Sequence, residues 1–124
     1  MSKPKSPNLQ KKQLGKLGEN LAKKHLQNKG YCFLVQNFHT RFGEIDLIFL
    51  DDKTVVFVEV KTRVDDTFGS PEEAISKTKI SHLKKAAYFF LQQNPQYEDS
   101  LLRFDAICIE IRSKQIRHYE NLMG

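Results

Sequence analysis

The chain of 124 residues carries 20 lysines and arginines against 15 aspartates and glutamates, for a formal charge of +5 and a pI near 9.2. Its length suits one domain, and its 40% of hydrophobic residues suffice for a single core. The absence of a long uncharged apolar run argues against a transmembrane span or a secretory signal, and the basic balance favours a polyanionic partner.

The first third of the chain is predicted to hold an arm, a helix and a strand. Residues 1–9 contain two prolines and are expected to form a disordered arm ahead of a single domain over residues 10–124. Apolar residues at helical spacing predict a helix over residues 10–28. The run YCFLVQNF predicts a strand over residues 31–38, and a polar connection follows through residue 43.

The remaining elements are predicted to be a hairpin, a second helix and a further strand. GEIDLIFL (43–50) and TVVFVEV (54–60) are apolar runs on either side of a short polar turn, which indicates a β-hairpin. Pro71 suits the first turn of a helix, which is expected to end before Pro95. LLRFDAICIEI (101–111) predicts a strand, followed by a short last strand or tail.

This order, α-β-β-β-α-β, predicts an α/β fold with a central mixed β-sheet flanked by helices. The hairpin supplies antiparallel pairing. The strand–helix–strand unit over residues 54–111 is expected to be a parallel, right-handed crossover.

Two acids interrupt the apolar runs of the hairpin. Asp46 lies within GEIDLIFL and Glu59 within VVFVEV. A carboxylate in such a strand is costly unless something pairs with it. These positions are therefore candidates for a functional site.

The predicted register of the hairpin brings the two acids together. A two-residue turn at Asp52-Lys53 would place Asp46 opposite Glu59 and Glu44 opposite Lys61. Lys61 would share a face of the sheet with Glu59. Opposed carboxylates repel, and a divalent cation would turn that repulsion into attraction.

An Asp–Glu–Lys set of this kind can hydrolyse a phosphodiester bond. Asp46 and Glu59 would hold Mg²⁺ or Mn²⁺, with the carbonyl of Val60 as a further ligand. The metal would polarise the phosphoryl oxygen and activate a bound water, and Lys61 would orient that water or offset developing charge. The alternative is a salt-bridged hairpin without a metal.

These residues resemble a known family. The sequence Gly43-Glu44-Ile45-Asp46 followed by Glu59-Val60-Lys61 is similar to the motif of the PD-(D/E)XK nuclease superfamily, which includes restriction endonucleases and Holliday junction resolvases. The closer resemblance is to the YraN-like family of bacterial endonuclease-like proteins. It is carried by GKLGENLA, GYCFLVQNF, GEIDLI, FVEVKTR, FGSPEEAISKTK and RFDAI, between about residues 15 and 107.

The resemblance implies a restriction-endonuclease-like core with Asp46, Glu59 and Lys61 at the catalytic motif. It also implies an additional acid near the metal, at Glu19, and a further motif position at Lys79. For Glu19 the alternative is a solvated helix acid, and for Lys79 it is a surface lysine. Ile45 stands where the motif's name has proline, a position that the chemistry does not require.

Basic residues near the predicted strand ends and on the second helix are candidates for contacts with nucleic acid, in a sequence-independent and salt-sensitive manner. These candidates are Arg41, Arg63, Lys77, Lys79 and Lys84. Phe68 could stack on a base. A solvated helix face is the alternative for each lysine, and core packing is the alternative for Phe68.

The sequence thus predicts a Mg²⁺-dependent endonuclease acting on branched or damaged DNA, with a non-catalytic nucleic-acid-binding module of the same fold or a protein-interaction module as alternatives. Cys32 and Cys108 lie in apolar runs and are predicted to be buried thiols, which suits a cytoplasmic protein. A homodimer and a monomer are both compatible with the sequence.

Overall fold

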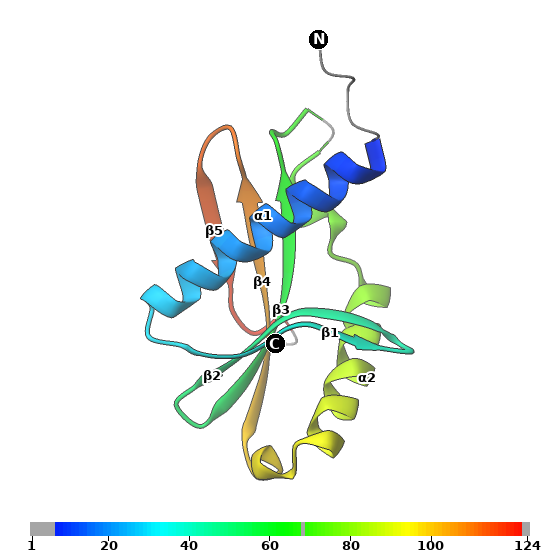
Figure 1. Ribbon diagram of the computed structural model, residues 1–124, viewed down its shortest axis with the longest axis vertical. Coiled ribbons are helices and arrows are strands. Elements are labelled where there is room, and N and C mark those ends of the chain that lie inside the picture. The colour runs from blue at the N-terminus through cyan, green and yellow to red at the C-terminus, as the bar shows by residue number, and fades with distance from the viewer. Residues whose placement is uncertain (1–6, 68, 123–124) are drawn as a thin grey trace.

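The computed structural model describes residues 7–67 and 69–122, which form a five-stranded sheet with a helix on each face (Figure 1). The elements are α1 (Pro7–Asn28), β1 (Cys32–Thr40), β2 (Gly43–Asp51), β3 (Thr54–Arg63), the 3-10 turn η1 (Pro71–Ala74), α2 (Lys77–Gln93), the 3-10 turn η2 (Pro95–Tyr97), β4 (Leu101–Glu110) and β5 (Gln115–Tyr119). The predicted α/β class and the order α-β-β-β-α-β are confirmed, and β5 is the predicted short last strand.

The sheet is mixed, with the strands in the order β1-β2-β3-β4-β5. Only β3 and β4 run parallel, on either side of the crossover through α2, and the other neighbours are antiparallel. The β2–β3 hairpin turns at Asp52, whose positive φ of 54° suits a two-residue turn, and it pairs Asp51 with Thr54 as predicted.

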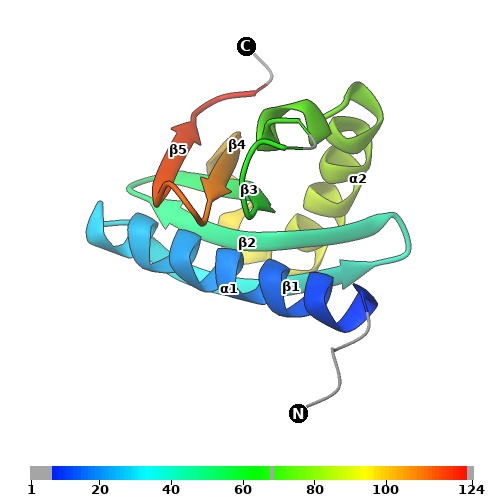
Figure 2. The same ribbon diagram turned by 90° about the horizontal axis from the view of Figure 1, so that it is seen from above.

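Alternating residues of the central strands supply two cores, one under each helix. Figure 2 shows α1 and α2 on opposite sides of β2. Val56, Val58 and Val60 of β3 face α1, where they meet Ala22 and Leu26. The intervening β3 residues face α2. Because side chains alternate along a strand, even- and odd-numbered residues of β3 point to opposite faces of the sheet. Glu59 therefore lies on the face covered by α2, together with Val55 and Phe57.

Several predicted boundaries differ from the structure. Helix α1 begins at Pro7, so the last residues of the expected arm are helical, while residues 1–6 lie outside the described residues. Strand β1 continues to Thr40, into the expected connection, and Asn37 within it has a positive φ of 55°.

The helix expected to open at Pro71 begins instead at Lys77. Pro71 starts only the 3-10 turn, and the backbone is extended at Ile75 and Ser76. The Ser76 side chain accepts a hydrogen bond from the Lys79 N–H at 3.2 Å, whereas Ser70 makes no such side-chain cap. The better N-cap therefore sets the start of α2.

Two further findings bear on the expected environment of the chain. Cys108 is buried as predicted, but Cys32 is exposed because it begins the edge strand β1. Among the described residues, neither helix combines the length and the apolar character that crossing a bilayer requires.

Candidate active site

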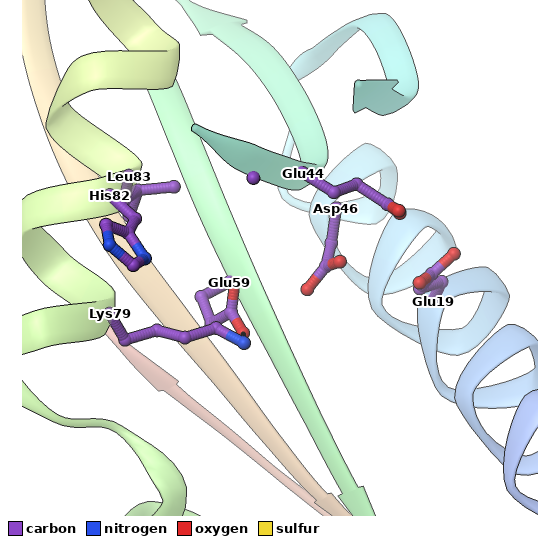
Figure 3. Close-up of a pocket in the computed structure, with 8 residues that line it drawn as sticks. Glu19, Glu44, Asp46, Glu59, Lys79, His82 and Leu83 are labelled. Carbon is purple, nitrogen blue, oxygen red and sulfur yellow. Dashed lines mark ion pairs between the residues drawn. The ribbon is translucent and has the colours of Figure 1, made fainter. Parts of the chain in front are cut away.

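A cavity of about 370 Å³ lies between the ends of β2 and β3, flanked by α1 and α2 (Figure 3). Four of its lining residues are acids that come from α1, β2 and β3. The full lining is Glu19, Gly43, Glu44, Asp46, Glu59, Lys79, His82 and Leu83. Three segments distant in sequence therefore direct carboxylates toward one space.

Asp46 enters the cavity where β2 and β3 separate. The pairing of these strands follows the predicted register as far as Leu47 and Val58. One step further, the Asp46 carboxylate accepts a hydrogen bond from the Val60 N–H at 2.8 Å, in place of continued pairing. Asp46 and Glu59 thus lie beside the same cavity, but the hairpin ladder ends before it reaches them.

Glu59 is buried, with 4% of its surface exposed, and two lysines pair with its carboxylate. Lys61 approaches Glu59 Oε1 at 3.2 Å along β3, and Lys79 reaches the same oxygen at 3.1 Å from α2. Lys61 therefore shares the face of Glu59, as predicted. The burial of Glu59 is tolerable because both cations offset its charge.

The expected pairing of Lys61 with Glu44 does not form, because β2 and β3 have already separated at these positions. Glu44 instead contacts His39 at 3.3 Å and accepts a hydrogen bond from the side-chain amide of Asn37. Asn37, whose φ is 55°, thus contacts an acid that lines the cavity.

Glu19, Glu44 and Asp46 form an acidic cluster, with one carboxylate oxygen from each lying within 4.8 Å of the others. The Asn37 amide donates to Glu19 at 2.9 Å as well as to Glu44, and so ties α1 to the strands. Sequence reasoning selected Glu19 and Asp46 but gave Glu44 only a salt-bridge role. Its position beside Asp46 in Gly43-Glu44-Ile45-Asp46 was the available signal.

The acidic surroundings alter the proton affinity of Asp46. Burial, the largest cause, and the nearby charge of Glu59 raise the pKa of Asp46 to about 8, although the hydrogen bond from the Val60 N–H opposes the change. Glu19 and Glu44 act in the same direction as Glu59. A cation among these carboxylates would therefore relieve an electrostatic cost.

Of the residues predicted to contact nucleic acid, one lines the cavity and others lie outside it. Lys79 lines the cavity, Arg63 lies at the end of β3, and Arg41 lies in the β1–β2 turn with its guanidinium 4.9 Å from the Phe42 ring centre. Lys84 is exposed on α2. The side chain of Lys77 and all of Phe68 lie outside the described residues.

His82 is a cavity residue that sequence reasoning left unassigned to the site. It lies one turn after Lys79 on α2, so both project toward the carboxylates from the same helix face (Figure 3). No local motif marks His82, since its place depends on how α2 packs against the sheet.

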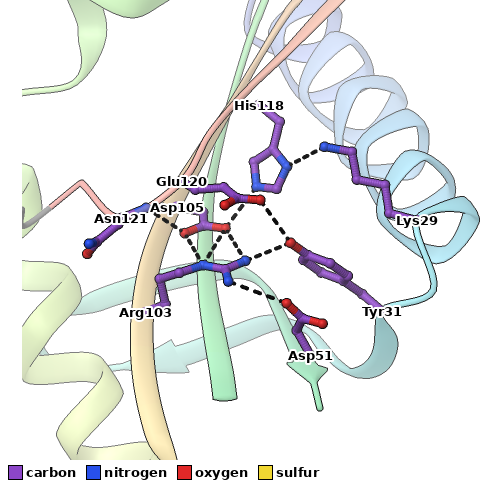
Figure 4. Close-up of polar contacts among 8 residues, drawn as sticks. All are labelled: Lys29, Tyr31, Asp51, Arg103, Asp105, His118, Glu120 and Asn121. Carbon is purple, nitrogen blue, oxygen red and sulfur yellow. Dashed lines mark hydrogen bonds and ion pairs between the residues drawn. The ribbon is translucent and has the colours of Figure 1, made fainter. Parts of the chain in front are cut away.

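A second buried acid, Asp105 of β4, anchors a polar network away from the cavity (Figure 4). Its carboxylate accepts hydrogen bonds from Arg103 Nε at 3.0 Å and from the Asn121 N–H at 3.0 Å. His118 Nε2 lies 2.8 Å away from Asp105, and His118 Nδ1 lies 2.8 Å from Lys29 Nζ. Because an ammonium only donates, Nδ1 accepts and Nε2–H donates to Asp105.

This network joins the C-terminal segment to the start of the sheet. Arg103 also donates to the Tyr31 hydroxyl at 2.7 Å and approaches Asp51 at 3.4 Å. Asp105 interrupts an apolar run as Glu59 does, so the same signal was present in the sequence and was missed.

Comparison with known proteins identifies the family. The sequence profile described as "Uncharacterised protein family UPF0102" matches residues 18–109, which include all four carboxylates of the cavity. The chain belongs to this family. The UPF0102 profile thus confirms the predicted resemblance to the YraN-like family.

UPF0102 relatives from several bacteria match most of the chain. A UPF0102 protein of Syntrophomonas wolfei is 46% identical over 112 residues, covering 89% of this chain and 96% of that protein. One from Vibrio parahaemolyticus is 45% identical, covering 92% of this chain and 94% of its own. One from Caldicellulosiruptor bescii is 47% identical, covering 83% and 87% respectively.

Proposed function

We propose that this UPF0102 protein is a metal-dependent endonuclease that hydrolyses phosphodiester bonds in DNA, with branched or damaged DNA as its substrate. The observation that carries the proposal is the convergence of four carboxylates and Lys79 at one cavity, with Lys61 paired to the same Glu59 oxygen as Lys79. Carboxylate oxygens are the donors that Mg²⁺ and Mn²⁺ prefer, and cations beside them suit a phosphate.

The donor set fits a hard divalent cation. Glu19, Glu44 and Asp46 already lie close enough to share one ion, and Glu59 with the Val60 carbonyl would complete the set. With its pKa raised to about 8, Asp46 is largely protonated at neutral pH unless a cation joins it. When bound, such a metal supplies Lewis-acid polarisation of the phosphate and an activated water.

The protein's own cations have a separate part in the proposal. Lys61 and Lys79 both contact Oε1 of Glu59, and Lys79 brings positive charge to the wall of the cavity. A phosphodiester in the cavity gains negative charge as the reaction proceeds, and these ammonium groups would stabilise it. His82, on the same helix as Lys79, would add a polar contact to the phosphate.

A non-catalytic nucleic-acid-binding module is the second candidate, and the pairing of Glu59 favours it. Lys61 and Lys79 satisfy that carboxylate without a metal ion. If these pairs persist when nucleic acid binds, the cavity would hold the phosphate without cleaving it.

Metal binding is tested by thermal unfolding with and without millimolar Mg²⁺ or Mn²⁺. The parent chain should gain stability, because a ligand that binds only the folded state stabilises it by mass action. Asp46→Asn should lose this gain, while Asp52→Asn, at the exposed hairpin turn, should retain it. An equal gain in all three proteins would place the ion elsewhere.

Activity is tested by incubating the protein with four-way, flapped and linear DNA in Mg²⁺, Mn²⁺ or EDTA. We expect cleavage of branched DNA that requires the metal and is lost in Asp46→Asn and Glu59→Gln. Cleavage that survives in both variants would reject the assignment of the site. Metal-independent binding with no cleavage by any of the proteins would support the second candidate.

A further inference from the structure

We propose that the groove between the N-terminal half of α1 and the end of β3 binds a single strand of nucleic acid that leads away from the cavity. We name this the α1–β3 groove. The inference rests on the proposed function and extends it, because it specifies an unpaired strand next to the reacting phosphate as the element that is recognised.

The α1–β3 groove adjoins the acidic cavity at Glu19. Its volume is about 760 Å³, and Glu19 lines both spaces. Lys61, which pairs with Glu59, also lines the groove. A chain molecule lying in the groove would therefore reach the carboxylates without leaving the surface of the protein. Figure 1 shows the dark-blue part of α1 beside the green end of β3.

Positive charge is distributed along the α1–β3 groove. Lys11 lies on the helix wall, and Lys61 and Arg63 lie on the strand wall. Asp65, the acid at the far end, has its own partner in Arg112 at 3.2 Å. Lys61 already contacts Glu59, whereas Lys11 and Arg63 make no ion pair among the described residues. These two cations are therefore available to the phosphates of a polyanion.

The groove also has apolar lining residues, which favour an unpaired strand over a duplex. Leu14, Val60 and Val64 line the groove, and Val64 is 46% exposed. A duplex keeps its bases stacked inside and presents mainly phosphates and groove edges to a protein. A single strand can place its base faces on the apolar surface while its phosphates meet the cations.

The strand wall is held rigidly. The carbonyl of Arg63 accepts a hydrogen bond from the Ile111 N–H at 2.9 Å, and the carbonyl of Val64 accepts one from the Arg112 N–H at 2.8 Å. Pairing with the chain after β4 thus continues past the end of β3. A groove of fixed shape binds a flexible strand with little cost for ordering the protein.

The test measures the binding of a fluorescein-labelled oligo-dT of about 20 nucleotides by fluorescence anisotropy. EDTA is present so that no cleavage occurs. We expect Lys11→Ala and Arg63→Ala each to weaken binding several-fold and to reduce the slope of log affinity against log salt by about 0.7, the value for one single-strand phosphate contact. Arg63→Lys, which keeps the charge, should retain most of the affinity.

Lys53→Ala is the matched control, since Lys53 is an exposed lysine of the β2–β3 turn at the opposite end of β3. It should bind as the parent does. Equal losses in Lys53→Ala and Arg63→Ala, or an unchanged affinity in the groove variants, would overturn the inference. So would an equal or tighter affinity for a duplex of the same length.

The outcome is separable from that of the proposed nuclease activity. Asp46→Asn should still bind oligo-dT through the α1–β3 groove while it fails to cleave DNA. If the parent chain cleaves no DNA but the groove variants lose oligo-dT binding, the groove assignment stands and the activity fails. If DNA is cleaved and the groove variants bind and cleave as the parent does, the groove assignment fails alone.

Discussion

The position of Glu19 at the cavity depends on the close approach of α1 to β3 at Gly18. A Cβ added to Gly18 would lie 1.8 Å from Thr62 Oγ1 and 2.8 Å from Thr62 Cβ. Any larger residue must therefore push the helix from the strand or distort Thr62. Gly15, one turn earlier on the same helix, has no atom within 4 Å of the corresponding position.

These two glycines give a matched pair of substitutions. Gly15→Ala should stabilise the protein by about 1 kcal/mol, since alanine is the better helix former. Gly18→Ala has the same intrinsic gain, but overpacking against Thr62 should cost about 1–3 kcal/mol. We therefore expect Gly18→Ala to be less stable than Gly15→Ala by about 1–3 kcal/mol in urea unfolding at neutral pH.

A second substitution tests whether Thr62 causes this difference. Thr62→Ala removes Oγ1 and Cγ2, at 1.8 and 3.0 Å from the added Cβ, but leaves its own Cβ at 2.8 Å. The double variant should recover part of the loss, with a coupling of about 0.5–1 kcal/mol. Within the described residues, Thr62 Oγ1 is also a buried polar atom without a hydrogen-bond partner, so removing it leaves no donor orphaned.

The variants Gly15→Ala and Gly18→Ala also test whether the packing of α1 affects the proposed metal site. Displacing α1 at Gly18 should move the adjacent Glu19 away from Asp46 and reduce the thermal stabilisation by Mg²⁺, whereas Gly15→Ala should leave it unchanged. Equal stability and an equal response to Mg²⁺ in both variants would contradict these expectations. They would show that the Gly18–Thr62 contact neither limits the packing of α1 nor positions Glu19.

Two further predictions concern the buried acids. Because the folded-state pKa of Asp46 is raised from 3.8 to about 8, its contribution to stability is full below pH 3.8 and is lost as pH rises toward 8. In EDTA, Asp46→Asn should therefore exceed the parent in urea stability at pH 9, with the difference shrinking toward pH 4; a constant difference would contradict this. Burial alone would raise the pKa of Asp105, but hydrogen bonds from His118, Arg103 and the Asn121 N–H hold it below its usual value. The ionised Asp105 therefore stabilises the folded state above pH 3.8, and this stabilisation is lost in acid. Asp105→Asn should cost about 3 kcal/mol at neutral pH in the same assay, because it removes the buried carboxylate that pairs with the Arg103 guanidinium. A cost no larger than that of Asp52→Asn would refute the network's role.

The hairpin was the part of the site that could be predicted, because its geometry is local. A two-residue turn and strict alternation fix which residues of neighbouring strands face each other, and the register held from Asp51–Thr54 to Leu47–Val58. Beyond that point β2 and β3 separate, while β2 stays paired with β1 on either side of Asn37, whose φ is 55°. The pairing of two strands, taken alone, cannot predict the effect of this third strand.

The contributions of the helices could not be derived in the same way. Lys79 and His82 read as surface residues of a basic helix, and only the packing of α2 against β2 and β3 brings them to Glu59. The resemblance to a family, rather than any periodicity, pointed to Lys79 and Glu19. Asp105 could have been found from the sequence, because its interruption of an apolar strand is as clear as that of Glu59.

The two central acids of the cavity differ in how their charges are balanced, and this difference bears on the proposed chemistry. Glu59 has two ammonium partners, whereas Asp46 has a backbone N–H and three neighbouring carboxylates. The binding free energy of a divalent cation should therefore be most favourable beside Glu19, Glu44 and Asp46, where the cation replaces a proton. It should be least favourable beside Glu59, where the cation competes with Lys61 and Lys79. Removing Lys79 should accordingly strengthen metal binding while weakening the hold on phosphate. A Lys79→Ala variant that bound Mg²⁺ more weakly than the parent, by calorimetry, would show that Lys79 supports the metal site instead of competing with it.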